Sequence, residues 1–153
     1  MEINDKTRKM LINNWRINED VAEILFNKCN RLNRFISIPG IYRHFKGYKN
    51  GEEMLYAVSN ISMPMESEEF SKMIKNGEEA LMMHHTEVGV NIVIIREGDR
   101  YYHNKGIDPE MLVMYTALYG DRESYLRPLP MFLSKTDKEK YPNAIQEYRL
   151  EEI

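Results

Sequence analysis

The sequence predicts an α+β domain that is mainly β, built as a small barrel with an N-terminal helix and with an inserted short helix and hairpin. About seven short apolar or β-branched runs are separated by turn residues, a pattern typical of small barrels. Only two long segments have helical spacing, and they do not alternate with the strands as βαβ folds require. A closed or half-closed barrel is therefore favoured over a parallel sheet.

The clearest helical segment spans residues 19–34. Asn18 is expected to cap its N-terminus, and Glu19 and Asp20 suit the positive end of the helix dipole. Apolar side chains recur at helical spacing and form one stripe, made of Val21, Ile24, Leu25, Cys29 and Leu32. A second helix of about two to three turns is expected after Pro64, with Ser67 as its cap.

The expected strands are short and are bounded by turn residues. They span residues 41–45, 55–58, 80–84, 90–96, 100–103, 111–119 and 148–150. Turns are expected at 49–51 and 97–99. The segment 127–130 is not expected in a central strand or a helix interior, because its two prolines lack the N–H that both need. One 3₁₀-like turn is expected at 131–133.

Length and composition favour one cytoplasmic domain. A chain of 153 residues with 42% hydrophobic side chains can bury a core without disulfides or metals. Its single cysteine, Cys29, cannot form an internal disulfide, and its place on the helical stripe indicates a buried thiol. No apolar run is long enough to span a membrane, and the first residues do not have the pattern of a signal peptide.

Positive charge is concentrated near the N-terminus although the net charge is −3. Between Glu23 and Glu52 there is no acidic residue. This gap contains the cations Lys28, Arg31, Arg34, Arg43, Lys46 and Lys49. Such a run can concentrate positive potential on one face and attract anions, unless its side chains pair with the more acidic remainder of the chain.

Several segments occur in an order that is similar to one known family. They are Gly40-Ile41-Tyr42-Arg43-His44-Phe45-Lys46-Gly47, Leu55-Tyr56-Ala57-Val58, His85-Thr86-Glu87, Val113 to Asp121 (VMYTALYGD) and Leu126 to Leu133 (LRPLPMFL). Together they resemble the family catalogued as domain of unknown function 1653, a set of small bacterial and phage proteins. The resemblance covers residues 40–60, 80–90 and 111–150, and it implies a compact SH3-like β-barrel without implying a reaction.

The chain departs from the family pattern in its additions. Residues 1–39 are expected to form an N-terminal helical extension packed on the barrel, and residues 40–153 the barrel domain. Insertions are expected at about 62–79 and at about 88–110, where the family usually runs almost directly between motifs. Tyr125 stands where the family tends to have tryptophan, just before the Arg127-Pro128-Leu129 segment.

The leading candidate site combines cations with aromatic rings. Arginine recognises phosphate or carboxylate in a bidentate manner, lysine supplies a point charge, and tyrosine can stack on a base. The candidate ligand-binding residues are Tyr42, Arg43, His44, Lys46, Tyr115, Tyr119 and Arg127. Strict strand alternation would place His44 and Lys46 on one face and Arg43 on the other. The alternative is that the aromatic residues fill the core and the cations are solvated.

Catalytic and metal sites have weaker signals. His84, His85, Glu87 and His103 are potential metal ligands, but their spacing fits no standard zinc motif. Asp121, Glu87 and His44 could meet as acid–base groups, yet the chain has no nucleophile elbow and no phosphate-binding glycine loop. We therefore expect no catalytic residues, no metal and no cofactor.

The expected function is non-catalytic binding of an anionic ligand, either a nucleotide-like small molecule or a nucleic acid. One form would be a phage protein that sequesters a host signalling nucleotide. The first alternative is a protein–protein adaptor or inhibitor that uses the acidic C-terminal half and the methionine-rich insertions, and the second is an enzyme acting on nucleotides or nucleic acid. A homodimer is also expected, because Phe26 and Phe35 lie off or at the end of the helical stripe and leave apolar area for a partner.

Overall fold

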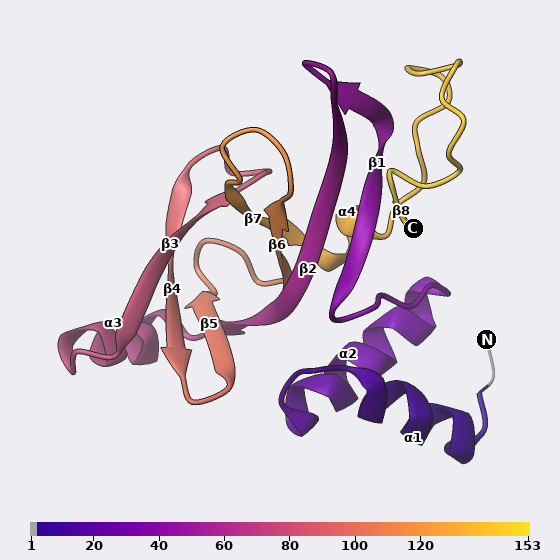
Figure 1. Ribbon diagram of the computed structural model, residues 1–153. Helices are drawn as coiled ribbons and strands as arrows, with labels where there is room; N and C mark the ends of the chain where they lie inside the picture. Colours follow the sequence, from indigo (N-terminus) through magenta and orange to yellow (C-terminus); the bar gives the residue numbers. More distant parts are fainter. Residues whose placement is uncertain (1–2) are drawn as a thin grey trace.

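The computed structural model describes residues 3–153, which form four helices and one eight-stranded sheet (Figure 1). In chain order the elements are α1 (Asp5–Asn14), α2 (Glu19–Leu32), β1 (Gly40–Lys49), β2 (Glu52–Met65), α3 (Ser67–Lys75), β3 (Glu79–His85), β4 (Asn91–Glu97), β5 (Arg100–Asn104), β6 (Leu112–Ala117), β7 (Ser124–Pro128), α4 (Leu129–Phe132) and β8 (Leu150–Glu152). The protein is mainly β, as the sequence predicts. In the described residues no helix is both long and apolar enough to cross a membrane.

The sheet closes part of itself into a ring. Its strand order is β5-β4-β3-β7-β6-β2-β1-β8, and β5 also pairs with β2. Six strands therefore form a ring of hydrogen bonds, while β1 and β8 extend the sheet beyond β2. Helix α3 falls in the segment 62–79 and strands β4 and β5 fall in the segment 88–110, both of which were expected to be insertions, so the second segment supplies two strands of the ring.

The longest strand, β2, connects the two parts of the sheet. Its residues 52–58 pair antiparallel with β1, residues 56–62 pair antiparallel with β6, and residues 62–65 pair in parallel with β5. A register shift with β6 at Ser59 lets the strand bend between these partners. Pro64 was expected to break the chain here, but it lies opposite His103 in the short parallel pair, where β2 is ending.

A wide bulge interrupts the pairing of β1 with β2. Asn50 and Gly51 both have positive φ, which produces the tight hairpin turn expected from the Asn-Gly pair. From this turn the strands pair up to Tyr48, and pairing resumes only at Arg43, opposite Leu55. Residues 44–47 of β1 thus lie opposite the single residue Met54. Gly47, at a φ of 78°, provides the backbone conformation that such a bulge needs.

Strand β6 is buried on both faces. Leu112 and Met114 point into the ring and pack with residues of β3, β4 and β7. Val113 and Tyr115 point to the opposite side and join the largest core, which also includes α1, α2 and α4. The N-terminal helices therefore share one core with the strands.

The N-terminal helices are fixed by caps and by Trp15. The Asn18 side chain accepts hydrogen bonds from the N–H groups of Asp20 and Val21, as expected for its cap. The Trp15 Nε1–H donates to the Ile36 carbonyl at 2.7 Å. Phe26 is buried and its ring centroid lies 5.4 Å from that of the partly buried Phe35, so Phe26 does not leave the apolar area for a partner that was expected of it.

Two details of α2 and α3 differ from the expected helices. On α2 the exposed members of the stripe are Ile24 and Leu32. On α3 the position of the N-cap is Glu66, and Ser67 is the first helical residue, whose hydroxyl donates to the Asn104 side chain. Ser67 therefore ties α3 to β5 instead of capping the helix.

Arg34, the last residue of the expected 19–34 helix, holds the C-terminal segment in place. Arg34 follows the helix end and donates hydrogen bonds to the carbonyls of Leu133 and Leu150. Its guanidinium also stacks over the Tyr148 ring, 3.9 Å from the centroid. The pKa of Arg34 is lowered because the group is buried. Arg34 thus links the end of α2 to β8 and to the residue after α4 by hydrogen bonds.

The proline-rich segment forms the end of β7 and the single turn α4. Arg127 and Pro128 pair with β6 but not with β3. The missing N–H of Pro128 therefore removes no hydrogen bond between β7 and β3. Leu129 and Phe132 are completely buried, which fits the expectation of a single turn that fills the core.

A buried polar network joins the ring strands. The N–H groups of Glu87 and Val88 donate to His85 Nδ1, so His85 Nε2 carries the proton and donates to Asp108 Oδ2 at 2.8 Å. His103 Nε2 donates to the Asp108 carbonyl, and His103 Nδ1 accepts from the Ser62 hydroxyl at 2.8 Å. Both histidines and Ser62 are completely buried. Asp108 therefore connects β3, β5 and β2.

Replacing Asp108 by alanine should lower the free energy of unfolding by about 2–4 kcal/mol, because it leaves the buried His85 Nε2–H without an acceptor. Urea unfolding followed by circular dichroism measures this change. Asp99→Ala is the matched control, since Asp99 is exposed and its loss should cost less than about 0.5 kcal/mol. Equal losses in the two variants would show that the network does not stabilise the ring.

Candidate functional site

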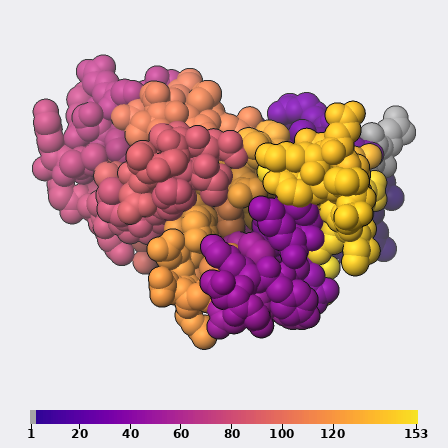
Figure 2. Space-filling view, turned by 90° about the horizontal axis from the view of Figure 1, so that it is seen from above, coloured from indigo at the N-terminus to yellow at the C-terminus, as the bar shows by residue number. Residues whose placement is uncertain are grey.

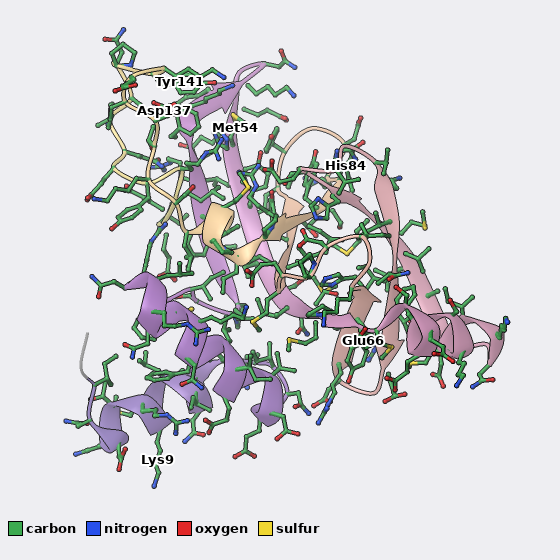
Figure 3. The ribbon with its side chains drawn as sticks, turned by 180° about the vertical axis from the view of Figure 1, so that it is seen from behind. Lys9, Met54, Glu66, His84, Asp137 and Tyr141 are labelled. Carbon is green, nitrogen blue, oxygen red and sulfur yellow. The ribbon has the colours of Figure 1, made fainter. Side chains whose placement is uncertain are left out.

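The candidate site lies at the end of the molecule where several turns converge. The β1–β2 hairpin, the turns after β3 and β6, and the C-terminal segment all reach this end (Figure 1). Figure 2 looks onto it, and shows the hairpin in purple, the C-terminal segment in yellow and the chain near residue 120 in orange. In Figure 3 Tyr141, Met54 and His84 lie at this end, and Lys9 lies at the opposite one.

His44 is the first residue of the bulge in β1. It pairs with Leu150 of β8, and the next residue, Phe45, donates its N–H to the Arg149 carbonyl at 2.9 Å. The His44 ring stacks on the Phe45 ring with centroids 4.5 Å apart. Its Nδ1 accepts a hydrogen bond from the Lys46 N–H at 3.1 Å, so the proton of the neutral ring lies on Nε2. His44 therefore offers one N–H donor.

Three cations surround His44. Burial and the positive charges of Arg127, Lys46 and Arg149 lower the pKa of His44 to about 4. The imidazole is therefore uncharged at neutral pH. Among residues 3–153 none of these three cations forms an ion pair with a carboxylate. The result is a locally positive surface on a protein whose net charge is negative.

Arg127 is the cation most enclosed by the fold. It is half-buried at the end of β7, and its Nε is buried without a hydrogen-bond partner among the described residues. Its positive charge also acts on Tyr115, whose pKa is nevertheless raised because burial has the larger effect. The guanidinium is thus partly enclosed by the fold, and its charge is not neutralised by a carboxylate within residues 3–153.

Tyrosine rings line the core side of the site. Tyr56 lies edge-on to Tyr115, Tyr119 and Tyr125, with centroid distances of 5.4 to 6.3 Å. The hydroxyls of Tyr56 and Tyr119 are 2.5 Å apart. Burial and then the Glu123 carboxylate raise the pKa of Tyr125 to about 12. We call His44, Lys46, Tyr56, Tyr115, Arg127 and Arg149 the basic–aromatic site.

Four of the residues expected at a ligand site come together here. Arg127 acts electrostatically on both His44 and Tyr115, and Lys46 acts on His44. Tyr115 is almost completely buried, so its ring supports the site from below and cannot stack on a ligand. Tyr119 lies at the edge, hydrogen-bonded to Tyr56.

Two of the expected residues lie elsewhere. Tyr42 is buried, its ring packs edge-on against Phe132, and its hydroxyl accepts the Ser37 N–H at 2.8 Å. Arg43 is exposed and pairs with Glu53 on the adjacent strand at 3.7 Å. Core packing and the ion pair with Glu53 explain these places, so neither residue contributes to the basic–aromatic site.

The residues considered as metal or acid–base groups are not gathered into one site. In residues 3–153 no group of three or more histidine, cysteine, aspartate or glutamate side chains is arranged to hold a metal. His85 and His103 belong to the buried network, and His84 packs edge-on against Tyr125. No hydrogen bond joins Glu87, Asp121 and His44 to one another in the part of the chain described. Cys29 is buried, which raises the pKa of its thiol to about 11.

Two open clefts flank the basic–aromatic site. One has a volume of about 410 Å³ and contains three carboxylates, those of Glu52, Asp121 and Glu123, with two cations, Lys49 and Arg122, so that acidic groups outnumber basic ones. The other, of about 400 Å³, is lined by Phe45, Lys46, Lys140, Tyr141, Pro142, Asn143 and Ala144. Only the second cleft has the charge that suits an anion.

Several residues of this region were not expected from the sequence. Arg149, Lys140 and Tyr141 reach the site because the chain after α4 returns along β1, with Gln146 donating to the Arg43 carbonyl at 3.0 Å. Their local sequence carries no signal for this contact. Tyr56 does have a sequence signal, because it belongs to the segment Leu55-Tyr56-Ala57-Val58 that resembles the family.

The family described as Protein of unknown function (DUF1653) matches residues 99–151 of the chain. This match confirms the resemblance over β5, β6, β7, α4 and β8, and it includes Tyr115, Arg127 and Arg149. It includes residues 99–110, which were expected to be part of an insertion, and it does not extend to 40–60 or 80–90. No curated protein and no solved structure matches the chain.

Acidification should destabilise the protein through His44 and His103. Both have a pKa of about 4 in the folded state against an ordinary value of 6.5, so the unfolded chain binds more protons between these values. The two uncharged histidines therefore contribute to the stability of the folded protein in full above pH 6.5, and this contribution is lost as the pH falls toward 4. Urea unfolding at about pH 7 and about pH 5 should show a loss on the order of 1–2 kcal/mol per histidine.

The variant His44→Gln removes one of these two contributions and leaves the buried network intact. Its free energy of unfolding should therefore change less between the two pH values than that of the unmodified protein. An unchanged pH dependence would mean that His44 is not held uncharged by burial and by the three cations.

Proposed function

We propose that this protein is a non-catalytic binding protein for an anionic ligand of the nucleotide type, bound at the basic–aromatic site. The observation that carries the proposal is that Lys46, Arg127 and Arg149 surround an uncharged His44 without carboxylate partners in the described chain. A phosphate group would neutralise these cations, and the Nε2–H of His44 would donate to it.

The aromatic surroundings favour a nucleotide over a simple anion. Arginine and lysine bind phosphate oxygens, while rings such as those of Phe45 and Tyr125 offer flat surfaces to a base. The proposal includes the form in which the ligand is a sequestered signalling nucleotide. It also keeps the cytoplasmic location that the single cysteine favours, and it treats the ring of strands as the SH3-like barrel that the family resemblance implies.

The adaptor alternative has less support from the geometry. Of the methionines in and beside the expected insertions, Met65, Met73, Met83, Met111 and Met114 are buried. Met82 alone among the described members of this group is largely exposed. These side chains fill the cores, so little of the methionine-rich surface is left for a partner.

A thermal-shift screen with nucleoside monophosphates, cyclic dinucleotides and short single-stranded RNA and DNA tests the proposal at low salt. At about a hundredfold excess over Kd a ligand should stabilise the protein by about 2.7 kcal/mol, seen as a higher Tm. The shift should shrink at high salt, because screening weakens contacts to phosphate. The proposal is wrong if none of these compounds stabilises the protein.

The variant Arg127→Gln separates the proposed site from non-specific attraction. It should reduce the Tm shift of the best ligand strongly, since two or more charge-assisted hydrogen bonds are lost. Lys9→Gln is the matched control, because Lys9 is an exposed cation at the opposite end of the molecule (Figure 3). Equal effects of the two substitutions would point to a general charge effect and against the site.

A further inference from the structure

The cleft beside the basic–aromatic site is built from two aromatic rings and two lysines. The rings of Phe45 and Tyr141 lie with centroids 4.8 Å apart, at an interplanar angle of 58°. Lys46 Nζ lies 5.9 Å from the Phe45 centroid and 5.5 Å from the Tyr141 centroid, and Lys140 Nζ lies 5.6 Å from the Tyr141 centroid. The cleft therefore offers ring faces together with two positive charges.

Local hydrogen bonds hold the wall of this cleft in place. The Asp137 carboxylate accepts the N–H groups of Glu139 and Lys140, and the Asp137 carbonyl accepts the Tyr141 N–H at 2.8 Å. The Thr136 N–H donates to the Glu147 carbonyl at 2.8 Å, which closes the loop at its base. Tyr141 is thus presented by an ordered turn, and less conformational freedom has to be lost when a ligand binds.

The cleft and the basic–aromatic site are continuous. Lys46 belongs to both, and the stacked rings of His44 and Phe45 connect them. Lys46 therefore lies between two places, one with cations around His44 and the other with the Phe45 and Tyr141 rings, whose faces are in contact with the ammonium groups of Lys46 and Lys140. Repeating phosphates joined to repeating bases match this arrangement, whereas a mononucleotide can occupy only one of the two places fully.

We propose that the Phe45–Tyr141 cleft is a base-stacking subsite, and that the ligand of the continuous surface is a single-stranded nucleic acid. One base lies against Tyr141, the phosphate beside it contacts Lys46 and Lys140, and a neighbouring phosphate contacts Arg127 and Arg149. Strand binders combine a positive groove with aromatic rings in this way, without hydrogen-bonded readout of each base. This inference rests on the proposed function and selects its ligand class.

Fluorescence anisotropy with labelled oligothymidylate and oligouridylate of about 12 nucleotides tests the inference. Tyr141→Ala should weaken the binding of at least one oligomer about tenfold, while Tyr141→Phe, which keeps the ring, should bind as the unmodified protein does. Lys140→Gln should lower the slope of log K against log salt by about 0.7, the value for one phosphate contact on a single strand. Lys75→Gln, an exposed lysine of α3, should change nothing.

The same titrations with thymidine and uridine monophosphates distinguish failure of this inference from failure of the proposed function. Binding of the monophosphate should depend on Arg127 and should be insensitive to Tyr141→Ala. If the monophosphate binds in this way but the oligomers bind no more tightly, or if Tyr141→Ala leaves oligomer binding unchanged, the stacking subsite is refuted and the anion site stands. If neither class of probe binds, the inference of a single-strand ligand is refuted, and the cyclic dinucleotides of the thermal-shift screen then decide the proposed function.

Discussion

The fold depends on the hydrogen bonds that β2 makes with three other strands, β1, β5 and β6. One edge of this strand pairs with β1 and then with β5, and the other pairs with β6. A strand has only two edges, so β1 must leave before β5 can begin, and the bend at Ser59 turns β2 between them. As a result, β2 closes the six-stranded ring through β5 and β6, while β1 and β8 extend the sheet outside the ring.

The site is a consequence of the bulge in β1. With four residues opposite Met54, the side chains of 44–47 no longer alternate between two faces as they would in a regular strand. The bulge brings His44 toward Arg127, and Arg149, the residue just before β8, lies alongside. Positive charge is concentrated there by backbone geometry, and the acidic remainder of the protein pairs with other cations, as Glu53 does with Arg43.

Sequence patterns predicted the local elements better than their partners. The cap at Asn18 and the turn at Asn50-Gly51 were expected, because each depends on neighbouring residues. The four co-located site residues were found from their chemical types and the family motifs. Arg149 and Tyr141 were missed, and Tyr42 was misplaced, because long-range pairing and core packing decide their positions.

The Arg127 Nε–H group gives the most direct test of the account, since it is buried, lacks a hydrogen-bond partner among the described residues and lies beside His44. Its resonance can be followed in ¹H–¹⁵N NMR spectra while oligothymidylate is added. We predict that this resonance and the backbone amides of residues 44–46, 140–144 and 149 shift together, while those of α1 and α3 do not. Shifts confined to α1, α3 or the ring strands, with Arg127 unchanged, would contradict the account.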